Sequence, residues 1–123
     1  MKGILFAAAF FGLSAVVLGA FGAHALREML SESALATYET AVKYQMWHAL
    51  AMLFVFLVTF QSSQPLFRWA AVCFGVGIVL FSGSLYLLAF GAPRWLGPVT
   101  PLGGLSFIAG WCLLMGAAFK LKV

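Results

Sequence analysis

The spacing of the charged residues constrains this chain more than any other feature of its sequence. The seven lysines and arginines and the three glutamates leave four charge-free windows, 3–26, 44–67, 69–93 and 95–119, each 24 or 25 residues long. A helix needs roughly 20 apolar residues to cross a hydrocarbon layer of about 30 Å. Because lipid offers no partner for backbone N–H and C=O groups, each crossing must be a helix. The spacing therefore predicts an all-α polytopic membrane protein with four transmembrane helices.

The composition excludes several classes of protein. Hydrophobic residues make up 64% of the 123 residues, and the mean hydropathy is +1.07. A soluble domain is about 45–50% apolar, so this chain lacks the polar surface that a water-soluble enzyme needs. Its basic residues are scattered singly rather than gathered into a patch, which argues against a nucleic-acid partner. The partner we expect is the lipid bilayer.

Local signals set the expected boundaries within a single transmembrane domain, 1–123. A polar segment follows the first window, in which Ser33 can cap a helix that begins near Ala34. Leu35, Tyr38 and Val42 then share one helical face, which predicts a short amphipathic surface helix between helices 1 and 2, running directly into helix 2. The expected transmembrane helices are about 3–26, 45–61, 67–90 and 101–120, and the surface helix is about 34–44.

The first window has a second interpretation, as a cleaved signal peptide. Ala23-His24-Ala25 fits the small-x-small pattern of a cleavage site, and Lys2 precedes the apolar run. The run is longer than the roughly 7–15 residues of a signal sequence, however, so a membrane helix is favoured.

Small residues recur in this window at spacings of four and three. Because lipid provides no hydrophobic drive for helix association, such a stripe predicts close contact with another helix. The residues of the stripe are Ala8, Gly12, Ala15, Gly19 and Gly22.

Uncharged polar residues at membrane depth are the candidate functional residues. They are His24, Gln45, His48, Ser82, Ser84, Tyr86 and Ser106. One interpretation is a shared polar pocket for a metal, haem, quinone, proton relay or small ligand. The other is a hydrogen-bonded core that fixes the helix register, which we favour because two histidines without a nearby carboxylate or cysteine are a weak metal signal. We expect His24 and His48 to point into the bundle, close to Ser82, Ser84 or Tyr86.

Four segments resemble a known family. They are Gly19-Ala20-Phe21-Gly22-Ala23-His24-Ala25-Leu26, Thr40-Ala41-Val42-Lys43-Tyr44-Gln45-Met46-Trp47-His48-Ala49-Leu50, Leu80-Phe81-Ser82-Gly83-Ser84-Leu85-Tyr86 and Thr100-Pro101-Leu102-Gly103-Gly104. With these motifs the chain resembles the domain-of-unknown-function 423 family, which is similar to eukaryotic transmembrane protein 256. The resemblance covers nearly the whole chain. It implies a small four-helix protein of the bacterial inner membrane, and it implies no reaction and no cofactor.

The functional expectation follows from the scarcity of reactive groups. No catalytic, metal-binding or phosphate-binding motif is evident, so we expect neither an enzyme nor a cofactor. We expect a non-enzymatic structural or accessory bundle that associates with itself or with a larger membrane complex. The alternative is a protein that binds or transports a small molecule, ion or lipid through a pocket around His24 and His48. With four crossings, four basic residues lie on the side of the termini and three on the other, which favours cytoplasmic termini.

Overall fold

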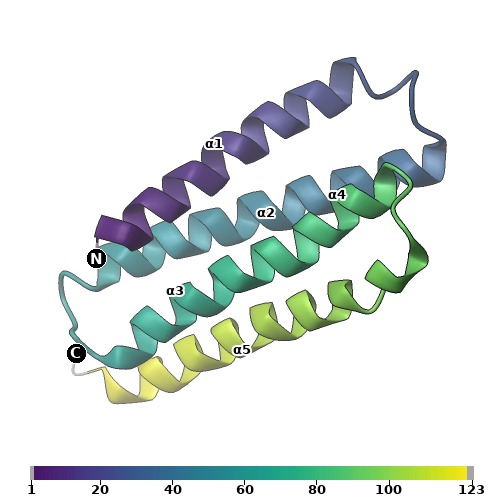
Figure 1. Ribbon diagram of the computed structural model, residues 1–123. Helices are drawn as coiled ribbons and strands as arrows, with labels where there is room; N and C mark the ends of the chain where they lie inside the picture. The colour runs from purple at the N-terminus through teal and green to yellow at the C-terminus, as the bar shows by residue number, and fades with distance from the viewer. Residues whose placement is uncertain (1, 122–123) are drawn as a thin grey trace.

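The computed structural model describes residues 2–121, and within that range it consists of helices and short connections. Three long helices each form a single element: α1 (Lys2–His24), α2 (Glu32–Val58) and α5 (Val99–Lys120). The remaining span, Pro65–Ala89, combines α3, a π-helical turn (η1) and α4, and a short 3-10 helix (η2) precedes α5 (Figure 1). The bounds of these shorter elements are Pro65–Gly77 for α3, Ile78–Ser82 for η1, Gly83–Ala89 for α4 and Arg94–Leu96 for η2. Four helical spans in the described range are long and apolar enough to cross a membrane, which confirms the predicted architecture.

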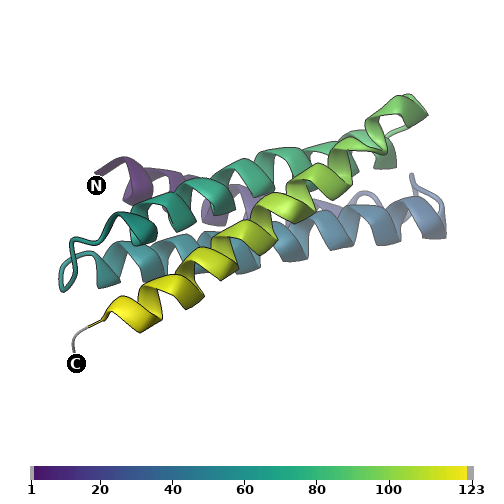
Figure 2. The same cartoon turned by 90° about the horizontal axis from the view of Figure 1, so that it is seen from below.

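The four spans run alternately up and down (Figure 1). The turn 59–64 lies at the same end as Lys2 and Lys120, here called the terminal end, and the connections 25–31 and 90–98 lie at the far end. α1 packs mainly along α2, α5 packs along α3 and η1, and α2 joins the two pairs. Figure 2 shows α5 crossing obliquely over the other helices. α1 has few contacts with α3, so the bundle is loosely packed on the side between these two helices.

The segment 34–44 is helical as predicted, but it is not a separate surface helix. It forms the first turns of α2, which continues without a break to Val58. The cap is Ser31 rather than the predicted Ser33, because the Ser31 hydroxyl accepts the Ala34 N–H at 3.2 Å. A helix of 27 residues is about 40 Å long, so α2 exceeds the hydrocarbon layer and carries its charged first turns beyond it.

These first turns are held by α1. Tyr38 is buried against Gly22, and its hydroxyl donates to the Leu18 carbonyl at 2.6 Å. Tyr38 lies between Glu32 and Glu39, so this contact holds the charged first turns of α2 against α1. The contact stabilises a straight α2 over a helix that bends onto the membrane surface.

Small residues of α1 face the bundle, and its large apolar residues face outward. Ala8, Ala15 and Gly22 are buried, whereas Phe6 and Leu13 are exposed. Of the predicted stripe, Gly19 meets Val42 and Gly22 meets Tyr38, but a side chain at Gly12 would meet nothing within 4 Å. The prediction that Gly12 faces another helix is therefore wrong. The cause is that α1 has one close neighbour, so only part of the stripe is covered.

Glycines and phenylalanines interlock between α5 and the span it crosses. The Phe107 ring covers Gly77, and the Phe74 ring covers Gly110 on the opposite helix. Gly103 lies directly against the Phe81 backbone, so a methyl group there would overlap main-chain atoms that cannot rotate away. These contacts need glycine for close approach, which is the usual basis of helix packing in membranes.

Candidate functional site

Gln45 is the centre of a first polar cluster, which joins three spans. Its Nε2 donates to the Phe11 carbonyl at 2.9 Å and to the Ser14 hydroxyl at 2.7 Å, both on α1. Its Oε1 accepts the Tyr86 hydroxyl of α4 at 2.7 Å. Gln45 is only 4% exposed, and all its hydrogen-bonding groups are engaged within the protein. This Gln45 cluster therefore fixes α1 and α4 against α2.

His48 is the centre of a second cluster, one turn further along α2. Its ring stacks on Phe107 with centroids 3.6 Å apart and an interplanar angle of 11°. The Trp111 indole Nε1 donates to His48 Nε2 at 3.1 Å, and His48 Nδ1 lies 2.8 Å from the Tyr44 carbonyl. Because α2 and α5 have few close backbone contacts, this His48 cluster is their main connection.

The two hydrogen bonds of His48 determine its tautomer. An indole N–H only donates, so Nε2 must be an acceptor and carry no proton. A carbonyl oxygen only accepts, so Nδ1 must carry the proton. One neutral tautomer, protonated at Nδ1, satisfies both contacts. In this arrangement neither nitrogen is free to bind a metal or to relay a proton.

Three serines of the predicted set each form a separate bond between helices or within one. Ser82, in the π-helical turn, donates to the Ala41 carbonyl of α2 at 2.7 Å. Ser84 donates to the Phe81 carbonyl and lies 2.5 Å from the Thr100 hydroxyl. A further bond comes from Ser106, which donates to the Cys73 carbonyl at 2.7 Å. The serines thus add connections around the two clusters rather than lining one space.

The expectation that both histidines point into the bundle is wrong for His24. His24 is exposed at the end of α1, and it takes no part in either cluster. His48 is buried as expected, but its partners are Trp111 and Tyr44 instead of Ser82, Ser84 or Tyr86. The seven predicted residues therefore comprise six internal groups and one exposed histidine. Thr100, the partner of Ser84, lies in the first turn of α5, which begins at Val99.

The Gln45 and His48 clusters contain two hydrogen-bonding side chains that are absent from the predicted set, although each leaves a signal in the sequence. Ser14 is the one polar side chain between Gly3 and Ala23, and a lone hydroxyl at membrane depth needs a partner. Trp111 lies in the middle of a predicted membrane helix, where no water is present and an indole N–H generally finds an acceptor within the protein. These rules would have added both residues, but they would not have said which acceptor or donor each one meets.

The two clusters were compared with what a metal or ligand centre requires. Within residues 2–121, no group of three or more His, Cys, Asp or Glu side chains is arranged to hold a metal ion. The one buried side-chain polar atom in this range without a hydrogen-bond partner is Gln64 Oε1, in the turn at the terminal end. A cavity of about 540 Å³ exists, but none of the seven residues lines it. What the arrangement does chemically is to satisfy polar groups inside a membrane helix bundle.

The fold and this polar core define a polytopic α-helical membrane protein. Residues 18–104 match the family described as "Protein of unknown function (DUF423)", and the chain belongs to this family. The chain is 42% identical over 120 residues to a UPF0382 membrane protein of Staphylococcus haemolyticus, with 98% of each chain covered.

A second relative comes from a distant bacterium. The chain is 41% identical over 119 residues to the UPF0382 inner membrane protein YgdD of Escherichia coli, covering 97% of this chain and 91% of that protein. A UPF0382 membrane protein of Staphylococcus saprophyticus is 40% identical over 121 residues. No solved structure matches the chain significantly. The family resemblance expected from the four sequence motifs is confirmed.

Proposed function

We propose that the protein is a non-enzymatic structural or accessory component of the bacterial inner membrane, which associates with itself or with a larger membrane complex. The observation that carries this proposal is the engagement of the polar groups at membrane depth. Gln45, His48 and Tyr86 are bonded to partners within the chain, so none of them is left to act on a substrate. The three glutamates are exposed near the far end and form no cluster with a histidine.

The alternative, binding or transport through a pocket around the two histidines, has less support. His24 is exposed, and both ring nitrogens of His48 are occupied. Ligand binding at this position would first have to break the bond from Trp111 and displace the stacked Phe107 ring.

The placement in the inner membrane rests on the printed name of the Escherichia coli relative. The orientation rests on the sequence count: four basic residues lie on the predicted side of the termini and three, Arg27, Lys43 and Arg94, on the other side. By the positive-inside rule we propose cytoplasmic termini. Alkaline phosphatase fused after Val123 is expected to be inactive, and an active fusion would overturn this orientation.

Association is the part of the proposal that an experiment can test directly. The protein, tagged at its C-terminus and expressed at its natural level, is extracted from its own membranes in a mild detergent and run on a native gel beside protein reconstituted alone. We expect migration well above the 13.2 kDa monomer, with chemical cross-links in intact membranes giving the same species. Migration as a monomer in both experiments would contradict an accessory role.

The same preparation separates this proposal from a redox or ligand-binding role. The purified protein is expected to show no Soret band, and Tyr86→Phe should alter stability without altering assembly. A Soret band that Tyr86→Phe or Trp111→Phe removes would overturn the structural interpretation in favour of a cofactor site.

A further inference from the structure

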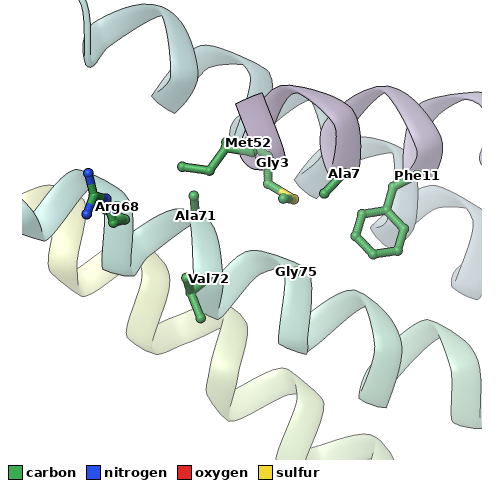
Figure 3. Close-up of a pocket in the computed structure, with 9 residues that line it drawn as sticks. Gly3, Ala7, Phe11, Met52, Arg68, Ala71, Val72 and Gly75 are labelled. Atoms are coloured by element: carbon green, nitrogen blue, oxygen red, sulfur yellow. The ribbon is translucent and has the colours of Figure 1, made fainter. Parts of the chain in front are cut away.

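A groove of about 540 Å³ runs between α1 and α3 near the terminal end (Figure 3). It exists because α1 packs on α2 and barely touches α3, so the space beside α2 is not filled by a helix. Small residues form part of both walls, Gly3 and Ala7 on α1 and Ala71 and Gly75 on α3, and the larger apolar residues are Ile4, Phe11, Met52 and Val72. Figure 3 shows Met52 of α2 between the two walls. A volume of this size is typical of a small-molecule site.

A single cationic side chain, Arg68, stands at one end of the groove (Figure 3). It is exposed in the first turn of α3, next to the interfacial Trp69. No Asp or Glu side chain lies near it in the described part of the chain, because all three glutamates lie between the end of α1 and the middle of α2, toward the far end. Arg68 also lines a second hollow of about 280 Å³ formed by the polar turn, which includes Ser62 and Gln64. The charge therefore faces both the apolar groove and a hydrophilic surface.

The two walls extend from Arg68 toward the hydrocarbon. Gly75 lies seven residues beyond Arg68 on the same helix, which is about 10 Å deeper at 1.5 Å per residue. α1 and α3 both start at the terminal end, so Phe11 on α1 lies at a similar depth to Gly75 and borders the inner end of the groove. An exposed cation with no acidic side chain near it in the described range thus stands at the outer end of an apolar groove.

We infer that this groove binds an anionic membrane phospholipid, with its phosphate on the Arg68 guanidinium and one acyl chain between α1 and α3. Charge complementarity selects an anion, and guanidinium groups match phosphate geometry with paired hydrogen bonds. The apolar walls select an amphiphile over a free anion, since a soluble phosphate would leave the slot empty. The inference concerns a different part of the molecule from the polar core, and it does not depend on the proposed accessory role.

Native mass spectrometry of the full-length protein in detergent tests this inference. The probes are phosphatidylglycerol, phosphatidylcholine with the same acyl chains, and inorganic phosphate. We expect the parent to bind phosphatidylglycerol more tightly than phosphatidylcholine. Arg68→Gln should weaken phosphatidylglycerol about five-fold, the change expected for one basic residue at the membrane surface, and abolish the preference between the lipids. Gly75→Leu should fill the slot and weaken both lipids.

Two control variants keep the comparison specific. Arg94→Gln removes a basic residue at the far end, and Gly12→Leu adds the same side chain to α1 at a position where a Cβ atom would meet nothing within 4 Å. Both should bind as the parent does. If circular dichroism shows that Gly75→Leu is unfolded, Ala7→Leu fills the same groove from the opposite wall.

Each contrary outcome rejects the inference. Equal binding of the two lipids by the parent, or an unchanged preference in Arg68→Gln, would show that Arg68 does not select the headgroup. Binding of inorganic phosphate that competes with phosphatidylglycerol would indicate a site for a free anion. A dimer that Gly75→Leu dissociates, with no lipid bound to the parent, would show that a second copy of the chain fills the groove.

Discussion

Replacing Gln45 with leucine removes the side chain that joins α1, α2 and α4. The substitution deletes three hydrogen bonds at once, to the Phe11 carbonyl, Ser14 and Tyr86. Hydrogen bonds between membrane helices average about 0.6 kcal/mol and reach about 1.7 kcal/mol. Three bonds therefore predict a loss of about 2–3 kcal/mol in the free energy of unfolding. Tyr86→Phe deletes one of the three and is expected to cost about 1 kcal/mol.

The double variant separates this account from a general loss of packing. Because the bond from Tyr86 to Gln45 is counted in both single variants, the double variant should be about 1 kcal/mol more stable than the sum of the two losses predicts. The assay is titration of the purified protein from mild detergent into dodecyl sulfate, followed by tryptophan fluorescence. Circular dichroism at 222 nm serves as a second probe of the same transition.

A matched cycle provides the control. Ser106→Ala removes a bond between α5 and α3 that shares no partner with Gln45, so its loss should add to that of Gln45→Leu within about 0.5 kcal/mol. Additive losses for Gln45 and Tyr86, or a Gln45→Leu variant as stable as the parent, would refute the reasoning that these groups form an internal network.

Three further predictions compare variants by thermal denaturation in detergent. Gly103→Ala should destabilise the protein by roughly 1–3 kcal/mol, because its methyl group would overlap a neighbouring backbone, while Gly104→Ala next to it should be nearly neutral; equal effects would contradict the packing of α5. Gly22→Ala should likewise destabilise, since a tyrosine ring covers that position, whereas Gly12→Ala should not; a costly Gly12→Ala would mean that α1 has a second neighbour. His24→Ala should change stability by less than about 0.5 kcal/mol, and a larger loss would place this histidine inside the bundle.

The sequence alone predicts the four spans because a charged side chain is unfavourable in the hydrocarbon layer. Each charge-free window long enough to cross that layer therefore marks one membrane helix. The prediction from sequence fails at the start of α2. Residues 34–44 are charged and amphipathic. This pattern is the same for a helix that lies on the membrane surface and for a membrane helix that extends beyond the bilayer, so it does not distinguish the two. The contact of Tyr38 with Gly22 favours the helix that extends beyond the bilayer, and that contact depends on how α1 and α2 pack. The π-helical turn at Ile78–Ser82 has no evident marker in the sequence either.

The sequence predicted part of the membership of the two clusters, missing Ser14 and Trp111 and wrongly including His24, and it did not predict the pairing. Hydrogen-bonding groups at membrane depth must find partners, so Gln45, His48 and Tyr86 were correctly expected to be internal. Which groups meet depends on the rotation of each helix about its axis, and a one-residue change turns a side chain by about 100°. His24 shows this sensitivity. It is the last residue of α1, where a small change in direction places the ring outside the bundle.

The central claim is that the polar residues at membrane depth form an internal structural core, and His48 tests it most directly. Solid-state nitrogen NMR of the protein in lipid bilayers, labelled at histidine and tryptophan, reports the protonation of each ring nitrogen. The account predicts a neutral His48 ring protonated at Nδ1, with Nε2 accepting a hydrogen bond from the Trp111 indole, and His48 signals that added Zn²⁺ leaves unchanged. Trp111→Phe removes the Trp111 indole signal and should shift the His48 Nε2 signal, while the signals of exposed His24 should not respond to this substitution. A proton on Nε2, or a His48 signal that shifts when Zn²⁺ is added, would contradict the account.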